Sequence, residues 1–106
     1  MNAERVQTLQ KLLELDPEDT FTRYALGLEF LAEDRPRARQ IFQEVLARQH
    51  DYVAAHFQLG KVAAELGDVS AARQAFEQGM EWAARQQDWH AHGELEEALN
   101  DLNDLE

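Results

Sequence analysis

Apolar residues recur every three or four positions along most of the chain, which is the spacing of amphipathic helices. In residues 2–15, for example, Val6, Leu9 and Leu13 fall on one stripe, and charged or amide side chains occupy most other positions. The second segment carries two apolar strips, so its helix needs two neighbours. The pattern predicts six helices: 2–15, Pro17 to about Glu33, one after Pro36 to about Gln49, two within 53–82, and 89–105.

Aspartates and prolines mark the expected helix boundaries. Asp16 precedes Pro17 and is therefore displaced from the helical region, so the first helix ends there. We expect Asp16 to cap the second helix, with Pro17 at its first position. By the same reasoning, Asp51 is expected to cap the fourth helix and Asp68 the fifth.

No segment has the alternating pattern of a strand, and the connections are only about two to four residues long. Short connections place sequential helices in antiparallel contact, so we predict an all-α fold of stacked helical hairpins. A chain of 106 residues is long enough for one domain and too short for two.

Two pairs of residues recur along the chain. Leu26-Gly27 returns as Leu59-Gly60 after 33 residues, and Ala38-x3-Phe42 returns as Ala72-x3-Phe76 after 34 residues. A period of this length is the signature of stacked helical hairpins. These residues resemble the tetratricopeptide repeat, and the resemblance covers nearly the whole chain. It divides the single domain, 1–106, into a half-repeat helix at 2–16, repeats at 17–50 and 51–86, and a capping helix at 88–105.

The repeated residues also have a physical role in such hairpins. We expect Gly27 and Gly60 to allow close approach of two helices opposite Ala38 and Ala72, and the two phenylalanines to fill the space between hairpins. Gly79 is expected to keep the next helix contact tight. The chain departs from the repeat pattern where Arg23 and His56 replace the opening aromatic residue, and His56 is expected to be an interior histidine.

Charge and composition exclude several classes of partner. The chain has 21 acidic and 10 basic residues, a formal net charge of −11, which disfavours binding to nucleic acid or to an anionic membrane. It has no cysteine, and no stretch is apolar enough to span a bilayer. We therefore expect an acidic, cytoplasmic protein. The acidic stretch that follows Gln86 is interpreted as a solubilising cap, or alternatively as an electrostatic filter for basic partners.

Catalytic and metal-binding motifs are weak. The only serine, Ser70, has no histidine near it in the sequence, and no glycine-rich phosphate loop exists, so we expect no enzymatic activity and no cofactor. His90 and Glu94 are one helical turn apart, as are His92 and Glu96, but no third ligand has suitable spacing. Solvated side chains explain these pairs better than a metal site does.

The resemblance implies a protein-interaction module that binds a peptide segment on a concave face. The residues at the corresponding positions are Phe21, Tyr24, Leu28, Leu31, Phe57 and Lys61. Two alternatives stay open. In the first, the apolar residues among them are ordinary core residues that pack on the first or last helix. In the second, the protein is a structural homodimer formed through the last helix. The leucines expected at such a dimer interface are Leu95, Leu99, Leu102 and Leu105.

Overall fold

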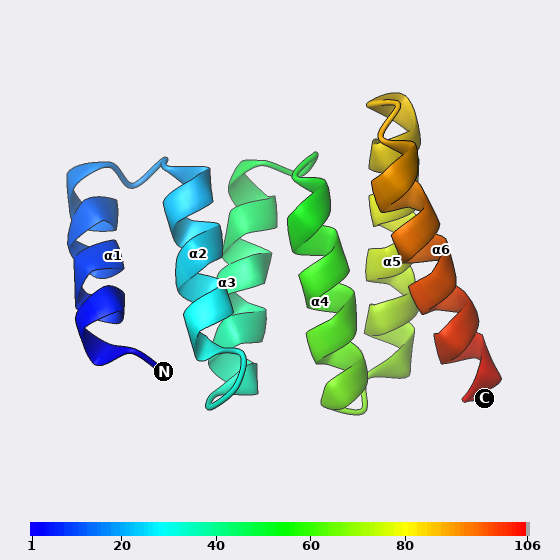
Figure 1. The fold of residues 1–106 in the computed structure, drawn as a ribbon, viewed down its shortest axis with the longest axis horizontal. Coiled ribbons are helices and arrows are strands. Elements are labelled where there is room, and N and C mark those ends of the chain that lie inside the picture. Colours follow the sequence, from blue (N-terminus) through cyan, green and yellow to red (C-terminus); the bar gives the residue numbers. More distant parts are fainter. Residues whose placement is uncertain (106) are drawn as a thin grey trace. The chain divides into compact units, whose positions relative to one another are not determined.

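The structure is a computed structural model that describes residues 1–105. It contains six α-helices, and residues 1–105 include no strand, so the predicted all-α class and number of helices are confirmed (Figure 1). The helices are α1 (Ala3–Leu15), α2 (Thr20–Phe30), α3 (Arg35–Arg48), α4 (Val53–Glu65), α5 (Val69–Arg85) and α6 (Trp89–Asp104). Their contacts divide the chain into an N-terminal unit, Met1–His50, and a C-terminal unit from Asp51 onward, which are described separately.

The second helix begins later than predicted, and Asp19 caps it instead of Asp16. The Asp19 carboxylate accepts hydrogen bonds from the backbone N–H of Thr22 (3.1 Å) and from its hydroxyl (2.7 Å). These bonds, the hydroxyl bond foremost, lower the pKa of Asp19. The prediction for Asp16 was wrong because this residue still closes α1, donating its backbone N–H to Leu12, and a turn is needed before the chain reverses.

The predicted cap of the fourth helix is also wrong. Tyr52 occupies the N-cap position of α4 and makes no capping hydrogen bond with its side chain. Asp51 lies one residue too early, and its carbonyl instead accepts a hydrogen bond from the Gln86 side chain (2.8 Å), which ties the start of α4 to the end of α5. The prediction for Asp68 is confirmed, because its carboxylate accepts a bond from the Ala71 N–H (3.2 Å).

The turns after α4 and α5 have the same geometry. Gly67 (φ 84°) and Gln87 (φ 59°) occupy the left-handed region at equivalent positions. In both turns the following aspartate donates its N–H to a carbonyl five residues earlier, at 2.8 Å. Glycine adopts this conformation without steric cost, whereas glutamine adopts it at a cost.

The core of the N-terminal unit joins all three of its helices. One buried apolar cluster combines Val6 and Leu9 of α1, Ala25 and Leu26 of α2, and Ile41 of α3. Within the α2–α3 hairpin the ring of Phe42 lies directly over Gly27, so that a Cβ there would be only 2.6 Å from the ring. The absence of a side chain at Gly27 thus makes room for this phenyl ring.

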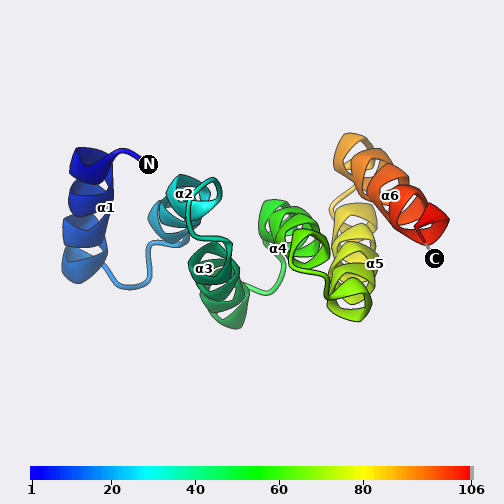
Figure 2. The ribbon, with the colours of Figure 1, turned by 90° about the horizontal axis from the view of Figure 1, so that it is seen from below.

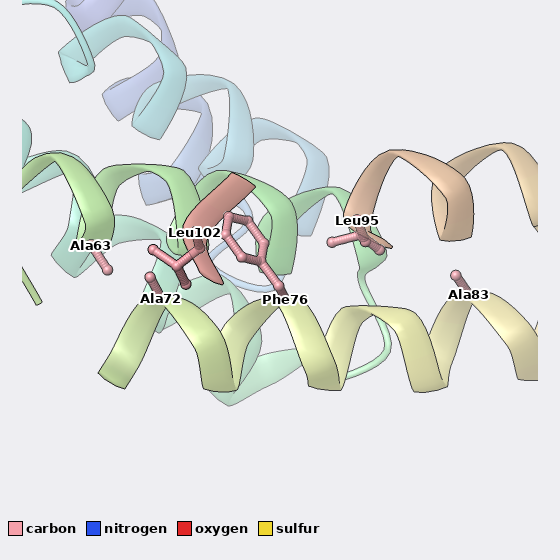
Figure 3. Packing of buried hydrophobic residues seen from close by; sticks show 6 residues of the cluster. All are labelled: Ala63, Ala72, Phe76, Ala83, Leu95 and Leu102. Carbon is pink, nitrogen blue, oxygen red and sulfur yellow. The ribbon is translucent and has the colours of Figure 1, made fainter. Parts of the chain in front are cut away.

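The C-terminal unit is organised around α5, which packs against both α4 and α6. Its core combines small residues with Phe76, Leu95 and Leu102 (Figure 3). Gly79 makes this packing possible, because a Cβ there would lie 3.0 Å from His56 on α4 and 3.0 Å from Leu95 on α6. The tight contact predicted at Gly79 is confirmed, and so is the interior position of His56, which is buried.

Candidate functional site

The C-terminal unit contains a groove of about 460 Å³ between α4 and α6. The two helices flank α5 (Figure 2). Phe76 of α5 also lines the groove. We call this cavity the α4–α6 groove. Its lining residues are Phe57, Lys61, Ala64 and Glu65 of α4, Phe76 of α5, Glu94, Glu97, Ala98, Asp101 and Leu102 of α6, and Leu105.

Helical spacing explains why these side chains face the same space. On α4 the lining residues are separated by four, three and one positions, and on α6 they begin at Glu94 and recur at three- or four-residue steps. Residues with this spacing lie on one face of a helix. Because both helices pack on α5, these two faces border a common cavity.

The floor of the groove is apolar and aromatic. Phe57 is half-buried, and its ring centroid lies 6.3 Å from that of Phe76, with the planes tilted by 45°. The Lys61 ammonium group lies 5.3 Å from the Phe57 centroid, over the ring. Such a cation over an aromatic face is a favourable contact of about 0.5–1 kcal/mol when exposed. Phe57 therefore presents an apolar surface that Lys61 partly covers.

The rim of the groove is acidic. Four carboxylates line it, Glu65, Glu94, Glu97 and Asp101, against the single cation of Lys61, for a formal charge of −4 + 1 = −3. All four side chains are exposed. The site prediction omitted these acids, although their three- and four-residue spacing along α6 was a usable signal.

The structure brings Phe57 and Lys61 together in the groove. The other predicted contacts, Phe21, Tyr24, Leu28 and Leu31, belong to the N-terminal unit. Phe21 is 71% exposed and Leu28 is 39% exposed, so they are not ordinary core residues. Tyr24 is partly buried, with its ring 5.7 Å from that of Phe42.

The leucines of the hypothetical dimer interface are unequally available. Leu95 and Leu102 are buried in the core of their own chain, and Leu99 packs against that core. Only Leu105, which is 79% exposed, has most of its side chain accessible. A dimer through all four leucines would require α6 to leave α5.

The histidine pairs form no cluster of metal ligands. His90 Nε2 lies 3.1 Å from the Glu94 carboxylate, and the His92 ring contacts that of Trp89 edge-on. In the part of the chain that the structure describes, no three His, Cys, Asp or Glu side chains converge as a metal site would require. Among residues 1–105, no helix is long and apolar enough to cross a bilayer.

A second cavity, of about 380 Å³, lies between the helices of the N-terminal unit. Arg23 and Arg37 line it together with Glu14 and Glu44, so its formal charges balance. It has no aromatic floor, and Leu13, Leu26 and Ile41 supply its apolar lining. The α4–α6 groove is therefore the better candidate for binding another protein's side chains.

Comparison with known proteins agrees with the fold and the repeat. A model of the tetratricopeptide repeat matches residues 29–95. The TPR repeat-containing protein PA0015 of Pseudomonas aeruginosa is 33% identical over 99 residues, which are 92% of this chain and 94% of that protein.

Solved structures give the same result. The solution structure of a tetratricopeptide repeat domain protein from Salinibacter ruber is 36% identical and superposes with a TM-score of 0.80, covering 86% of this chain and 93% of that one. PcrH, solved in complex with the chaperone binding region of PopD, shares the fold with a TM-score of 0.86 at 19% identity, covering 92% and 75% of the two chains. Tetratricopeptide repeat proteins are generally scaffolds without enzymatic activity that mediate protein–protein interaction. The repeated residues, the helical fold and the sequence matches together show that this chain belongs to the tetratricopeptide repeat family.

Proposed function

We propose that this protein binds a peptide segment of a partner protein, and that the α4–α6 groove holds one apolar side chain of that segment. The observation that carries the proposal is the half-buried Phe57 ring at the floor of a 460 Å³ cavity. Cavities of about 300–1,000 Å³ with an apolar lining and a few polar groups are typical binding sites.

The expected affinity follows from the size of the groove. Burying one large apolar side chain contributes about 1.5–3 kcal/mol, and the flanking contacts add to it. With flanking contacts that bring the total to about 5.5–7 kcal/mol, the dissociation constant is on the order of 10–100 μM. PcrH offers a parallel for the fold alone, since it is solved with a segment of another protein.

Selection from a displayed library of twelve-residue peptides tests the proposal. The selected peptides are labelled, and their dissociation constants are measured by fluorescence anisotropy with the parent chain and with Phe57→Ala. Loss of the ring should weaken binding about 10-fold, as expected for an anchor contact of more than 1 kcal/mol. Leu66→Ala is the matched control, because Leu66 is an apolar residue of the same unit, is 39% exposed and lies outside the groove.

Two results would contradict the proposal. One is a library that yields no binder, and the other is unchanged affinity in Phe57→Ala when its circular dichroism shows an intact fold. Backbone amide shifts then give an independent check, because a bound peptide should perturb the amides of Ala64, Ala98 and Leu102 first.

The contribution of Phe21, Tyr24, Leu28 and Leu31 stays a prediction. It is tested with the same selected peptides and the double variant Tyr24→Ala, Leu28→Ala. If these residues contact the ligand, the double variant should bind the peptides more weakly than the parent chain does. Adding Phe57→Ala to it should weaken binding further. Unchanged affinity with an intact fold would remove these four residues from the site and leave the groove as proposed.

A further inference from the structure

The α4–α6 groove combines an apolar floor with an acidic rim, and this combination selects among peptides. Resting on the function proposed above, we infer that the bound segment is cationic: an apolar side chain that enters over Phe57, flanked by lysine or arginine side chains that face the carboxylates of α6. The partner class is thus a basic, partly apolar segment of a protein.

The acidic side chains of α6 are positioned for such a ligand. Glu94, Glu97 and Asp101 recur at three- and four-residue steps, so they lie on the face that borders the groove. Glu94 has His90 beside it. Glu97 and Asp101 make no ion pair or side-chain hydrogen bond within residues 1–105. These two carboxylates are therefore available to a cation from another molecule.

Helix α6 has no lysine or arginine that would offset the negative charge of its carboxylates. The sequence contains no lysine or arginine after Arg85, and the only basic residue that lines the groove is Lys61, which lies over Phe57 on the α4 wall. The formal charge of −3 at the groove has the same sign as the −11 of the whole chain. Both attract a positively charged segment and raise its rate of encounter.

The spacing of the carboxylates sets the length of the segment. Glu94 and Asp101 are seven residues apart, which is about 10 Å along a helix that rises 1.5 Å per residue. An extended peptide advances about 3.3 Å per residue, so two cations about three residues apart face the two ends of this row.

Other occupants fit less well. An acidic segment would meet four carboxylates, and nucleic acid would meet them with its phosphates. A second copy of this chain that approached through α6 would bring the same acidic row against itself, and both copies carry a net charge of −11. A basic protein segment is the occupant that the charges favour.

Three synthetic nine-residue peptides test the inference. They share one central leucine and differ only in the flanking residues, which are lysine, glutamine or glutamate. Dissociation constants are measured by fluorescence anisotropy at about 50 and 200 mM salt. The lysine-flanked peptide should bind at least several-fold more tightly than the glutamine-flanked one, and the advantage should shrink at high salt because screening weakens exposed charge pairs.

A matched pair of variants locates the effect. Glu97→Gln with Asp101→Asn should weaken the lysine-flanked peptide about 5-fold, as expected for two exposed charge pairs. Glu77→Gln with Glu81→Gln removes the same charge from exposed positions of α5 outside the groove and should change affinity less than 2-fold. Lys61→Gln removes the only cation of the groove and should strengthen binding of the lysine-flanked peptide about 2-fold.

The outcomes separate this inference from the proposed function. Equal affinity of all three peptides, with amide shifts at Ala64, Ala98 and Leu102, would overturn the cationic preference and support peptide binding in the groove. Equal weakening by the two variant pairs would also overturn it, because the effect would then come from net charge alone. If neither these peptides nor any library peptide shifts the groove amides, both proposals are wrong.

Discussion

Replacing Gly60 by alanine should destabilise the C-terminal unit, although alanine is the better helix former. A Cβ at this position of α4 would lie 2.6 Å from Cδ1 and 2.8 Å from Cζ of Phe76, well inside an ordinary contact of 3.4 Å. Cε1 of the same ring would lie closer still, so the ring has to retreat by more than 0.8 Å (3.4 − 2.6). Phe76 is only 3% exposed and packs within the core cluster of its unit, so the ring is not free to swing away.

The magnitude follows from two opposing effects. Alanine in place of glycine stabilises a helix interior by about 0.5–1 kcal/mol. Overpacking of a well-packed core costs about 1–3 kcal/mol. Because the buried Phe76 ring can shift only slightly toward the groove that it borders, the cost lies near the middle of this range, at about 2 kcal/mol. The net loss should be about 1 kcal/mol.

Gly93→Ala is the matched control. Gly93 lies inside α6 and a Cβ there would meet nothing within 4 Å, so this variant should gain about 0.5–1 kcal/mol. Denaturant unfolding followed by circular dichroism measures both free energies, which should differ by about 2 kcal/mol. Phe76→Leu should lessen the cost of Gly60→Ala in a double-mutant cycle. If Gly60→Ala proves as stable as Gly93→Ala, the proposed steric conflict with Phe76 does not exist.

Four further outcomes are expected. Asp68→Ala should cost about 1 kcal/mol because a capping bond is lost, whereas Asp51→Ala, which removes no cap, should cost little; chemical denaturation of both variants compares them. Gln87→Gly should raise the unfolding free energy by about 0.5–1 kcal/mol in the same assay, because it relieves the left-handed backbone at φ 59°, and an unchanged value would refute this. Because the pKa of Asp19 is lower in the folded than in the unfolded state, its ionised carboxylate stabilises the fold at pH values above the unfolded-state pKa. This stabilisation is lost as the pH falls through the folded-state pKa. Asp19→Ala should therefore lose less relative to the parent at pH 3 than at pH 7, and a pH-independent difference would show that the carboxylate charge is not involved. Sedimentation at about 100 μM should show a monomer, because two leucines of the hypothetical dimer interface are buried in their own chain. A dimer at this concentration would support the interface through α6.

Local signals in the sequence were sufficient for the helices and for part of their packing. The three- and four-residue spacing predicted six helices because burial of one face is enough to define an amphipathic helix. The cap at Asp68 was predicted correctly, since a capping aspartate acts through a bond to a residue only three positions away. Phe57 and Lys61 were predicted as contacts of the concave face from the resemblance to the repeat, and both line the α4–α6 groove.

Features that depend on distant residues needed the tertiary structure. The caps expected at Asp16 and Asp51 were displaced because the way in which one helix ends determines where the next one begins. The phenyl ring over each repeat glycine comes from the partner helix of the hairpin, and its packing depends on how the two helices cross. The groove that the acidic residues of α6 border could not be predicted for the same reason. Lys61 and Asp101 are 40 residues apart in sequence, and α4 and α6 border one groove because both pack on α5, tightly around Gly79.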